Sequence, residues 1–136
     1  MVKSLSGQSR VQLKLRLFYS RAMITRCGLR PICAICGKPI YEDPDMHEAI
    51  FTKGVVQGSS VNIDVETNCV LVHPGGTSSK CHRKAQTKEG RRLCIAQIIY
   101  YVGYNSVRQW IESLSGQLSP VTIGERLSFI KEFEDG

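Results

Sequence analysis

The histidines of this chain lie close together, and cysteines flank them. A Cys-x-x-Cys pair, "CAIC", ends at Cys36, and Cys81 stands directly before the last histidine. The 136 residues contain three histidines: His47 and His73 lie between these two points, and His82 directly follows Cys81. In a chain without a secretory leader, such spacing is typical of metal sites rather than disulfides. The pattern therefore predicts a small fold organised around a bound metal.

The cellular compartment can be inferred from the first residues of the chain together with the cysteines. Residues at the start of the chain are basic and polar, and no apolar stretch precedes a small-residue cleavage site, so we expect no signal peptide. We therefore expect a cytoplasmic protein whose six cysteines stay reduced. No apolar run reaches the about 18 residues that a membrane span needs, so we expect no membrane association.

Charge is distributed unevenly along the chain. Residues 1–41 contain eight Lys and Arg and no Asp or Glu, whereas residues 42–136 contain ten basic and twelve acidic residues, a net −2. A basic segment beside a metal site favours a polyanionic partner, and nucleic acid is the usual one. A basic face that serves only solubility is the alternative.

The periodicity predicts short elements. Residues 10–26 fit a helix through Val11, Leu15, Phe18 and Ala22, but the alternation of Val11, Leu13, Leu15 and Leu17 also fits a strand. Strands are predicted at 45–51 and 69–73, with loops at 53–60 and 73–80. Helices are predicted from about Cys81, at 90–101, at 105–114 with Asn105 or Ser106 as N-cap, and at 120–133 with Pro120 in the first turn. The fold class is therefore α+β.

Four motifs occur in a definite order, "CAIC" (33–36), "DMHE" (45–48), "NCVLVH" (68–73) and "KCHRKA" (80–85). In this order they resemble the HNH endonuclease family, whose shared fold is a ββα-metal finger. The family has a His on the first strand, an Asn before the second strand and a His at the start of the helix. The matching residues here are His47, Asn68 and His82. The resemblance covers about residues 26–90.

The resemblance implies a division of the chain into three parts. A basic N-terminal segment, helical if the helix interpretation holds, occupies residues 1–26. A ββα-metal core with a zinc knuckle occupies 27–90, and a helical extension occupies 91–136. Aromatic residues in the extension, within 100–114, either contact DNA or pack into a core, and we favour the core.

A structural zinc ion is implied by the same resemblance, because many members, especially in phages, hold one with two Cys-x-x-Cys pairs. Here a His replaces the first Cys of the second pair, and seven residues, "PGGTSSK", follow it. The implied ligands are Cys33, Cys36, His73 and Cys81. Cys69 is a competing fourth ligand, although a lone Cys in a strand is more often a buried apolar residue. Cys27 and Cys94 have no ligand spacing and are interpreted as free structural thiols.

The resemblance also implies metal-dependent hydrolysis of DNA phosphodiester bonds. A His general base with a pKa near ~6.5 would activate water, and one divalent ion, held by Asp45 and His82, would act as Lewis acid. Mg²⁺, Mn²⁺, Co²⁺, Ni²⁺ and Zn²⁺ all suit such mixed ligands. Asn68 would either bridge strand and loop or reach the metal or phosphate.

Two assignments of the "DMHE" strand remain open. Either His47 is the base and Asp45 the metal ligand, or Glu48 is the base and His47 the ligand. Residues i and i+2 of a strand share a face, which favours Asp45 and His47 as the pair.

The function could also be a non-catalytic, zinc-stabilised nucleic-acid-binding module or a phage packaging accessory protein. The expected partner is DNA, contacted by the basic N-terminal segment, with a second copy of the chain or a phage protein as further options. A phage-encoded chain would act in the host cytoplasm. A monomer would nick one strand, whereas a dimer would cut both.

Overall fold

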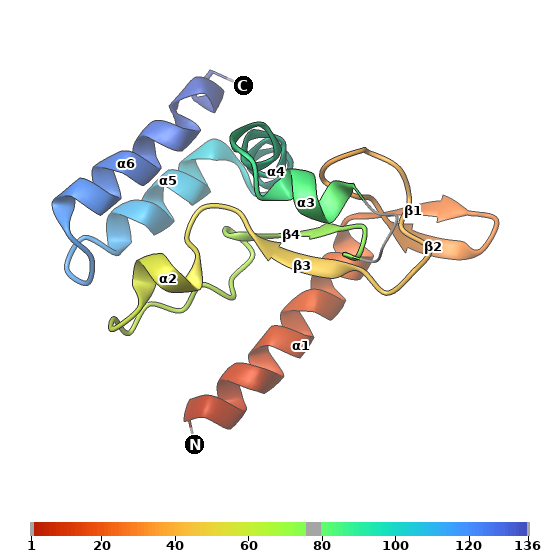
Figure 1. Cartoon of the computed structure of the whole chain (residues 1–136), viewed down its shortest axis with the longest axis horizontal. Helices are drawn as coiled ribbons and strands as arrows, with labels where there is room; N and C mark the ends of the chain where they lie inside the picture. The colour runs from red at the N-terminus through yellow and green to blue at the C-terminus, as the bar shows by residue number, and fades with distance from the viewer. Residues whose placement is uncertain (1, 76–79, 136) are drawn as a thin grey trace.

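The computed structural model of the chain describes residues 2–75 and 80–135, with side chains from residue 10 onward. This part is a small α+β protein with six helices and two two-stranded sheets (Figure 1). The elements are α1 (Val2–Ser20), β1 (Ala22–Thr25), β2 (Gly28–Pro31), β3 (Asp45–Glu48), α2 (Lys53–Val56), β4 (Cys69–Val72), α3 (Cys81–Ala85), α4 (Lys88–Val102), α5 (Tyr104–Ser113), α6 (Pro120–Ile130) and the 3₁₀ turn η1 (Lys131–Phe133).

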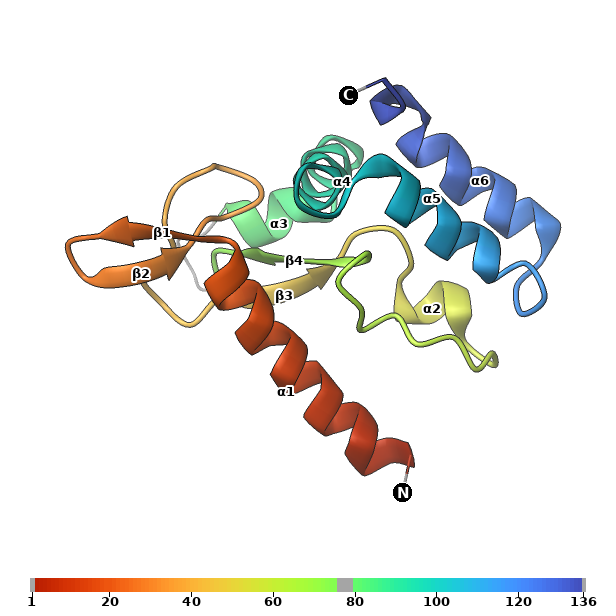
Figure 2. The same ribbon diagram turned by 180° about the vertical axis from the view of Figure 1, so that it is seen from behind.

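The sheet of β3 and β4 lies between α1 on one side and α3 with α4 on the other, as both views show (Figures 1 and 2). The strands are antiparallel, with Asp45 opposite Val72 and Glu48 opposite Cys69. Because side chains alternate between faces, Asp45 and His47 share one face, and Glu48 points to the other. Both predicted strands are confirmed with their predicted starts, but β3 ends at Glu48 instead of residue 51, and β4 ends at Val72 instead of residue 73.

Helix α1 resolves the open choice in the N-terminal segment. Leu13 and Leu17 are buried at helical spacing, whereas Leu15 between them is exposed, which excludes a strand with one apolar face. The prediction of a helix as far as residue 26 is wrong, because the helix ends at Ser20. The β-branched residues after it enter a hairpin instead, and Gly28, with φ of +90°, closes its turn.

The C-terminal helices lie where they were predicted, but α4 begins at Lys88, α5 begins at Tyr104, and α6 ends at Ile130, where the 3₁₀ turn η1 follows. Ser119 caps α6 by accepting a hydrogen bond from the Thr122 amide, and Pro120 follows as its first residue. The predicted N-cap of α5 is wrong: the helix begins at Tyr104, directly after Gly103 with φ of +89°. Glycine permits this sharp turn without a capping side chain. The predicted loop at 53–60 also contains the short helix α2.

One contiguous hydrophobic core joins α1, the β3–β4 hairpin and the C-terminal helices. Phe51, after β3, is fully buried and packs edge-to-face on Trp110 of α5, with ring centroids 5.4 Å apart. Val107 and Ile111 of α5 are also fully buried, so the core-packing prediction is confirmed for α5, whereas Tyr101 of α4 is exposed. Tyr100, at the end of α4, is 82% exposed. No helix in the described residues has the length and apolarity that a membrane span requires.

Candidate metal centre and adjoining polar site

Four sulfur and nitrogen donors meet where the loop after β2 approaches the start of α3. The donor atoms of Cys33, Cys36, His73 and Cys81 all lie within 4.8 Å of one another. Sγ of Cys36 is 3.5 Å from Nδ1 of His73. Two such ligands on a tetrahedral zinc, with Zn–S of about 2.3 Å and Zn–N of about 2.0 Å, would be about 3.5 Å apart. The donor set and its spacing therefore fit a structural zinc ion.

The backbone shapes the first half of this cluster. The Cys33 amide donates to the Lys38 carbonyl, and the Gly37 amide donates to the Cys33 carbonyl, each at 2.9 Å. Gly37 has φ of +74°, which closes the tight knuckle. The Ala34 amide donates to the carbonyl of Leu71 in β4 at 3.0 Å. The knuckle is thereby fixed to the sheet that also leads to His73.

The deprotonated form of the clustered thiols is unfavourable without a cation nearby. Burial, together with the nearby thiols of Cys33 and Cys36, raises the pKa of Cys81 above its ordinary value. Neighbouring thiolates repel one another, and a bound cation removes that repulsion and stabilises the deprotonated form. A metal ion held by these four donors would account for three thiols lying around one imidazole.

The other cysteines lie outside this cluster. Cys69 is fully buried, its thiol donates to the Ile63 carbonyl at 3.4 Å, and burial raises its pKa to about 12. Cys94 is buried in α4, and burial raises its pKa to about 12 as well. Cys27 is exposed in the β1–β2 turn. Of the two competing fourth ligands, the structure brings His73 and not Cys69 to the other three.

A second polar site adjoins the cluster, because His82 directly follows Cys81. Nδ1 of His82 lies 2.9 Å from Oδ2 of Asp45 in β3. The atoms are at hydrogen-bond distance but are not aligned as one, and this buried nitrogen has no aligned partner among the described residues. Two neighbouring ligands of an octahedral ion, each at about 2.1 Å, would be about 3.0 Å apart. The pair thus has the spacing of two donors to one cation.

His47 belongs to the same face of β3. Its side chain is half-buried, beside the backbone of Ala85 in α3. Burial lowers the pKa of His47, Glu48 opposes this effect, and His82 adds to it. A lowered pKa keeps the imidazole neutral at neutral pH, so that it can accept a proton.

Glu48 and Asn68 occupy different surroundings. Glu48 stands opposite Cys69 on the other face of the hairpin, so the structure does not bring it to His82. Asn68 is fully buried. Its Oδ1 accepts from the amides of Ile50 and Phe51 at 3.0 and 2.8 Å, and its Nδ2 donates to the carbonyls of Phe51 and Ile63 at 2.9 Å. Asn68 therefore bridges strand and loop, and its amide oxygen is already doubly engaged.

Basic residues of α1 border the polar site. Arg10, Lys14, Asp45 and His82 line one open pocket of about 420 Å³. Arg10 pairs with Asp64 at 2.5 Å, and Lys14 pairs with the exposed Asp43 at 3.2 Å. The sequence placed this helix in a separate segment, and no local signal indicated that these two cations line the pocket of Asp45.

Gly75 is a further residue that the sequence analysis assigned only to a loop. Its amide donates to Oδ2 of Asp45 at 2.8 Å, and a Cβ at this position would lie 3.2 Å from Cγ of His82. A glycine here lets the loop after His73 approach both residues closely. In the sequence, the glycines of "PGG" were the signal that could have indicated this close approach.

The fold and the site together define a small α+β protein with a Cys₃His cluster that could bind zinc. This chain matches no protein-family model, no curated protein and no solved structure.

Proposed function

We propose that this chain is a metal-dependent endonuclease of the HNH type, which hydrolyses DNA phosphodiester bonds. In this proposal β3, β4 and α3 form a ββα-metal finger. One observation carries the proposal: Asp45, His47 and His82 converge on one side of the hairpin, directly beside the Cys₃His cluster. Scattered structural histidines have no reason to adopt this arrangement.

The zinc site has a structural role in this proposal. Its four ligands link the knuckle, the end of β4 and the start of α3. Zinc bound there fixes Cys81 and thereby the position of His82 one residue later. A small domain with a modest core gains much of its stability from such a link.

The second ion has a catalytic role. Asp45 and His82 would hold a divalent cation, which when bound supplies Lewis-acid stabilisation of the phosphate and the leaving oxygen. His47, neutral in its half-buried position, would accept the proton of the attacking water. Asn68 would position the loop after β3 through its backbone hydrogen bonds. Mixed N and O donors leave the choice of Mg²⁺, Mn²⁺ or a related ion open.

DNA would reach this site along α1. Arg10 and Lys14 border the pocket that contains Asp45 and His82, and the first 41 residues contain eight cations and no anion. Lys and Arg in such a segment neutralise backbone phosphates without regard to base sequence. Arg10 and Lys14 of the basic segment thus line the same pocket as Asp45 and His82.

A supercoiled-plasmid assay across divalent ions tests the proposal. The zinc-loaded protein should convert supercoiled DNA to open circles or linear molecules with at least one added ion, and His82→Ala should require more of that ion. Open circles as the final product would indicate a monomer acting on one strand. A folded, zinc-loaded protein that binds DNA but cuts it with none of these ions would instead be a non-catalytic binding module.

A further inference from the structure

Basic residues continue past His82 into α4. Residues 80–92 contain six Lys and Arg and one Glu, a net +5 that is concealed within the net −2 of residues 42–136. The six are Lys80, Arg83, Lys84, Lys88, Arg91 and Arg92. A second concentration of positive charge therefore begins at the polar site and runs away from it along the chain.

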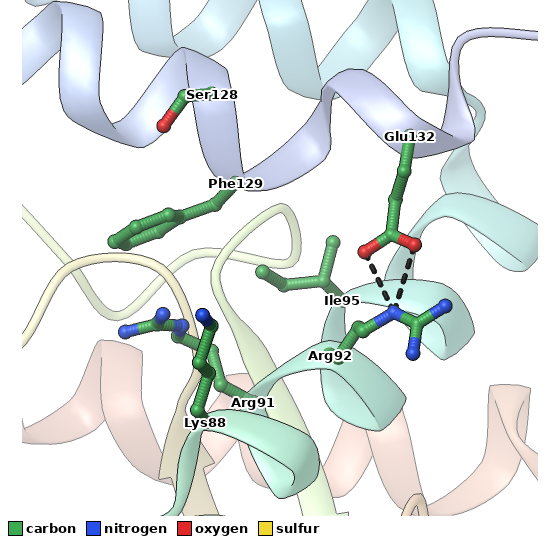
Figure 3. Close-up of a pocket in the computed structure, with 7 residues that line it drawn as sticks. All are labelled: Lys88, Arg91, Arg92, Ile95, Ser128, Phe129 and Glu132. Carbon is green, nitrogen blue, oxygen red and sulfur yellow. Dashed lines mark hydrogen bonds and ion pairs between the residues drawn. The ribbon is translucent and has the colours of Figure 1, made fainter.

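Three of these cations line a cavity between α4 and α6 (Figure 3). The cavity is about 310 Å³, and its apolar side is formed by Ile95 and Phe129. Figure 3 shows Lys88 and Arg91 side by side at one end and Arg92 with Glu132 at the other. The two ends differ in how their charges are balanced.

Arg92 and Glu132 neutralise each other, with Nε of Arg92 2.7 Å from both carboxylate oxygens. Among the described residues, neither Lys88 nor Arg91 has a carboxylate at ion-pair distance. The cavity as a whole therefore has a net charge of +2, located at the end of Lys88 and Arg91. An anion entering at that end would meet two unpaired cations and no unpaired carboxylate of the cavity.

The guanidinium of Arg91 packs against the ring of Phe129. The Cζ atom of Arg91 lies 3.8 Å from the centre of the ring, and that of Arg126 lies 5.0 Å from it. Stacking occupies the face of a guanidinium and leaves its N–H edge available to two oxygens of a phosphate. Arg126 is already paired with Glu125, so Arg91 is the guanidinium at this ring that can receive an anion.

We propose that this cavity binds a backbone phosphate of the DNA that the polar site is proposed to cleave, so the inference rests on the proposed substrate. Lys88 is six positions after His82, so their Cα atoms are at most about 22 Å apart. This is less than one turn of B-DNA, about 34 Å. One duplex is therefore long enough to contact both places, with α1 supplying its contacts on the other side of the hairpin.

The salt dependence of DNA binding by the full-length, zinc-loaded protein tests this inference. Each neutralised phosphate contributes about −0.9 to the slope of log K against log salt. Lys88→Gln should reduce the slope by about 1, and Arg91→Gln should do so too, whereas Arg91→Lys should retain most of it. The matched control is Lys131→Gln. Lys131 is exposed in η1, directly after α6, and lines a different pocket with Glu112 and Glu134. Lys88 is exposed, so its replacement should leave the thermal midpoint unchanged.

Equal slopes for Lys88→Gln, Lys131→Gln and the wild type would overturn the inference and leave Arg91 as a clamp between helices. A thermal shift with inorganic phosphate that Lys88→Gln abolishes, together with an unchanged DNA slope, would also overturn it, because the site would then serve a small phosphate ligand. The cleavage proposal can fail separately. If the wild type never cuts DNA but Lys88→Gln still reduces the salt slope, the cavity remains a DNA contact and only the cleavage proposal is rejected. Conversely, cleavage by the wild type with no effect of either substitution on binding rejects the cavity alone.

Discussion

Asp45 and His82 face each other across the β3–α3 junction, with Oδ2 of one 2.9 Å from Nδ1 of the other. His82 directly follows Cys81, a member of the Cys₃His cluster. The geometry of the polar pair therefore depends on the same short helix that the candidate zinc site holds. Loss of the cluster should remove both sites together, whereas loss of the pair should leave the cluster intact.

Zinc content is the first expected outcome. The purified protein should contain one tightly bound zinc per chain, and Cys81→Ser should lose both the metal and the cooperative fold. Structural zinc binding is worth about 10–16 kcal/mol in small fingers, as much as the whole stability of a typical domain. Metal analysis and circular dichroism measure both, with Cys27→Ser as a control that should retain zinc. A stable wild type without zinc would refute the assignment.

The fourth ligand can be tested with a pair of substitutions. His73→Ala should lose zinc, because the imidazole is 3.5 Å from the sulfur of Cys36 and completes the donor set. Cys69→Ser should retain zinc and lose about 1–2 kcal/mol of stability, because its thiol is buried and donates to a carbonyl. Metal analysis that shows the reverse pattern would make Cys69 the ligand.

Thiol alkylation followed by mass spectrometry should separate the cysteines into classes. Burial raises the pKa of Cys69 and Cys94 to about 12, so at pH 8 only about one thiol in 10⁴ is ionised, and both should react very slowly. Cys27 is exposed and should react. Cys36 is also exposed, but bound zinc should protect its thiol from alkylation, and removal of zinc by a chelator should make it reactive. Rapid labelling of Cys69 in the native protein would contradict its position in the core.

Asn68 should act through stability. Asn68→Ala removes the partners of two buried amides and two carbonyls, and each unsatisfied group costs about 1–3 kcal/mol, so a loss of about 3 kcal/mol or more is expected. Chemical denaturation measures this loss. The control Asn62→Ala removes one exposed hydrogen bond and should change stability by less than about 0.5 kcal/mol. An Asn68→Ala variant as stable as the wild type but inactive would indicate a direct role in catalysis.

Local spacing predicted the parts of the fold that depend on near neighbours. The short segments at "DMHE" and "NCVLVH" predicted β3 and β4, and Pro120 marked the start of α6. The positions of Cys33, Cys36 and Cys81 indicated a common cluster, and the structure brings them together with His73. These patterns reflect constraints that act over a few residues or through one shared metal.

Features that depend on distant contacts were not predictable in this way. Ala22–Thr25 continues a helical pattern, but its pairing with β2 is decided by tertiary structure. Lys14 and Asp45, which come from separate predicted segments, line one pocket. The charge at Lys88 and Arg91 was concealed because it was averaged with an acidic C-terminal region.

Single-turnover cleavage by two variants of the same strand tests the central claim most directly. His47→Ala should slow cleavage by about 10²–10⁴-fold, the usual contribution of a general base, while zinc content and DNA affinity stay at wild-type levels. Glu48→Gln, on the opposite face of β3, should cleave at close to the wild-type rate. An inactive Glu48→Gln with a His47→Ala that high metal concentrations restore would make Glu48 the base and His47 the ligand. Full activity in both variants would show that this face of the hairpin is not the active site.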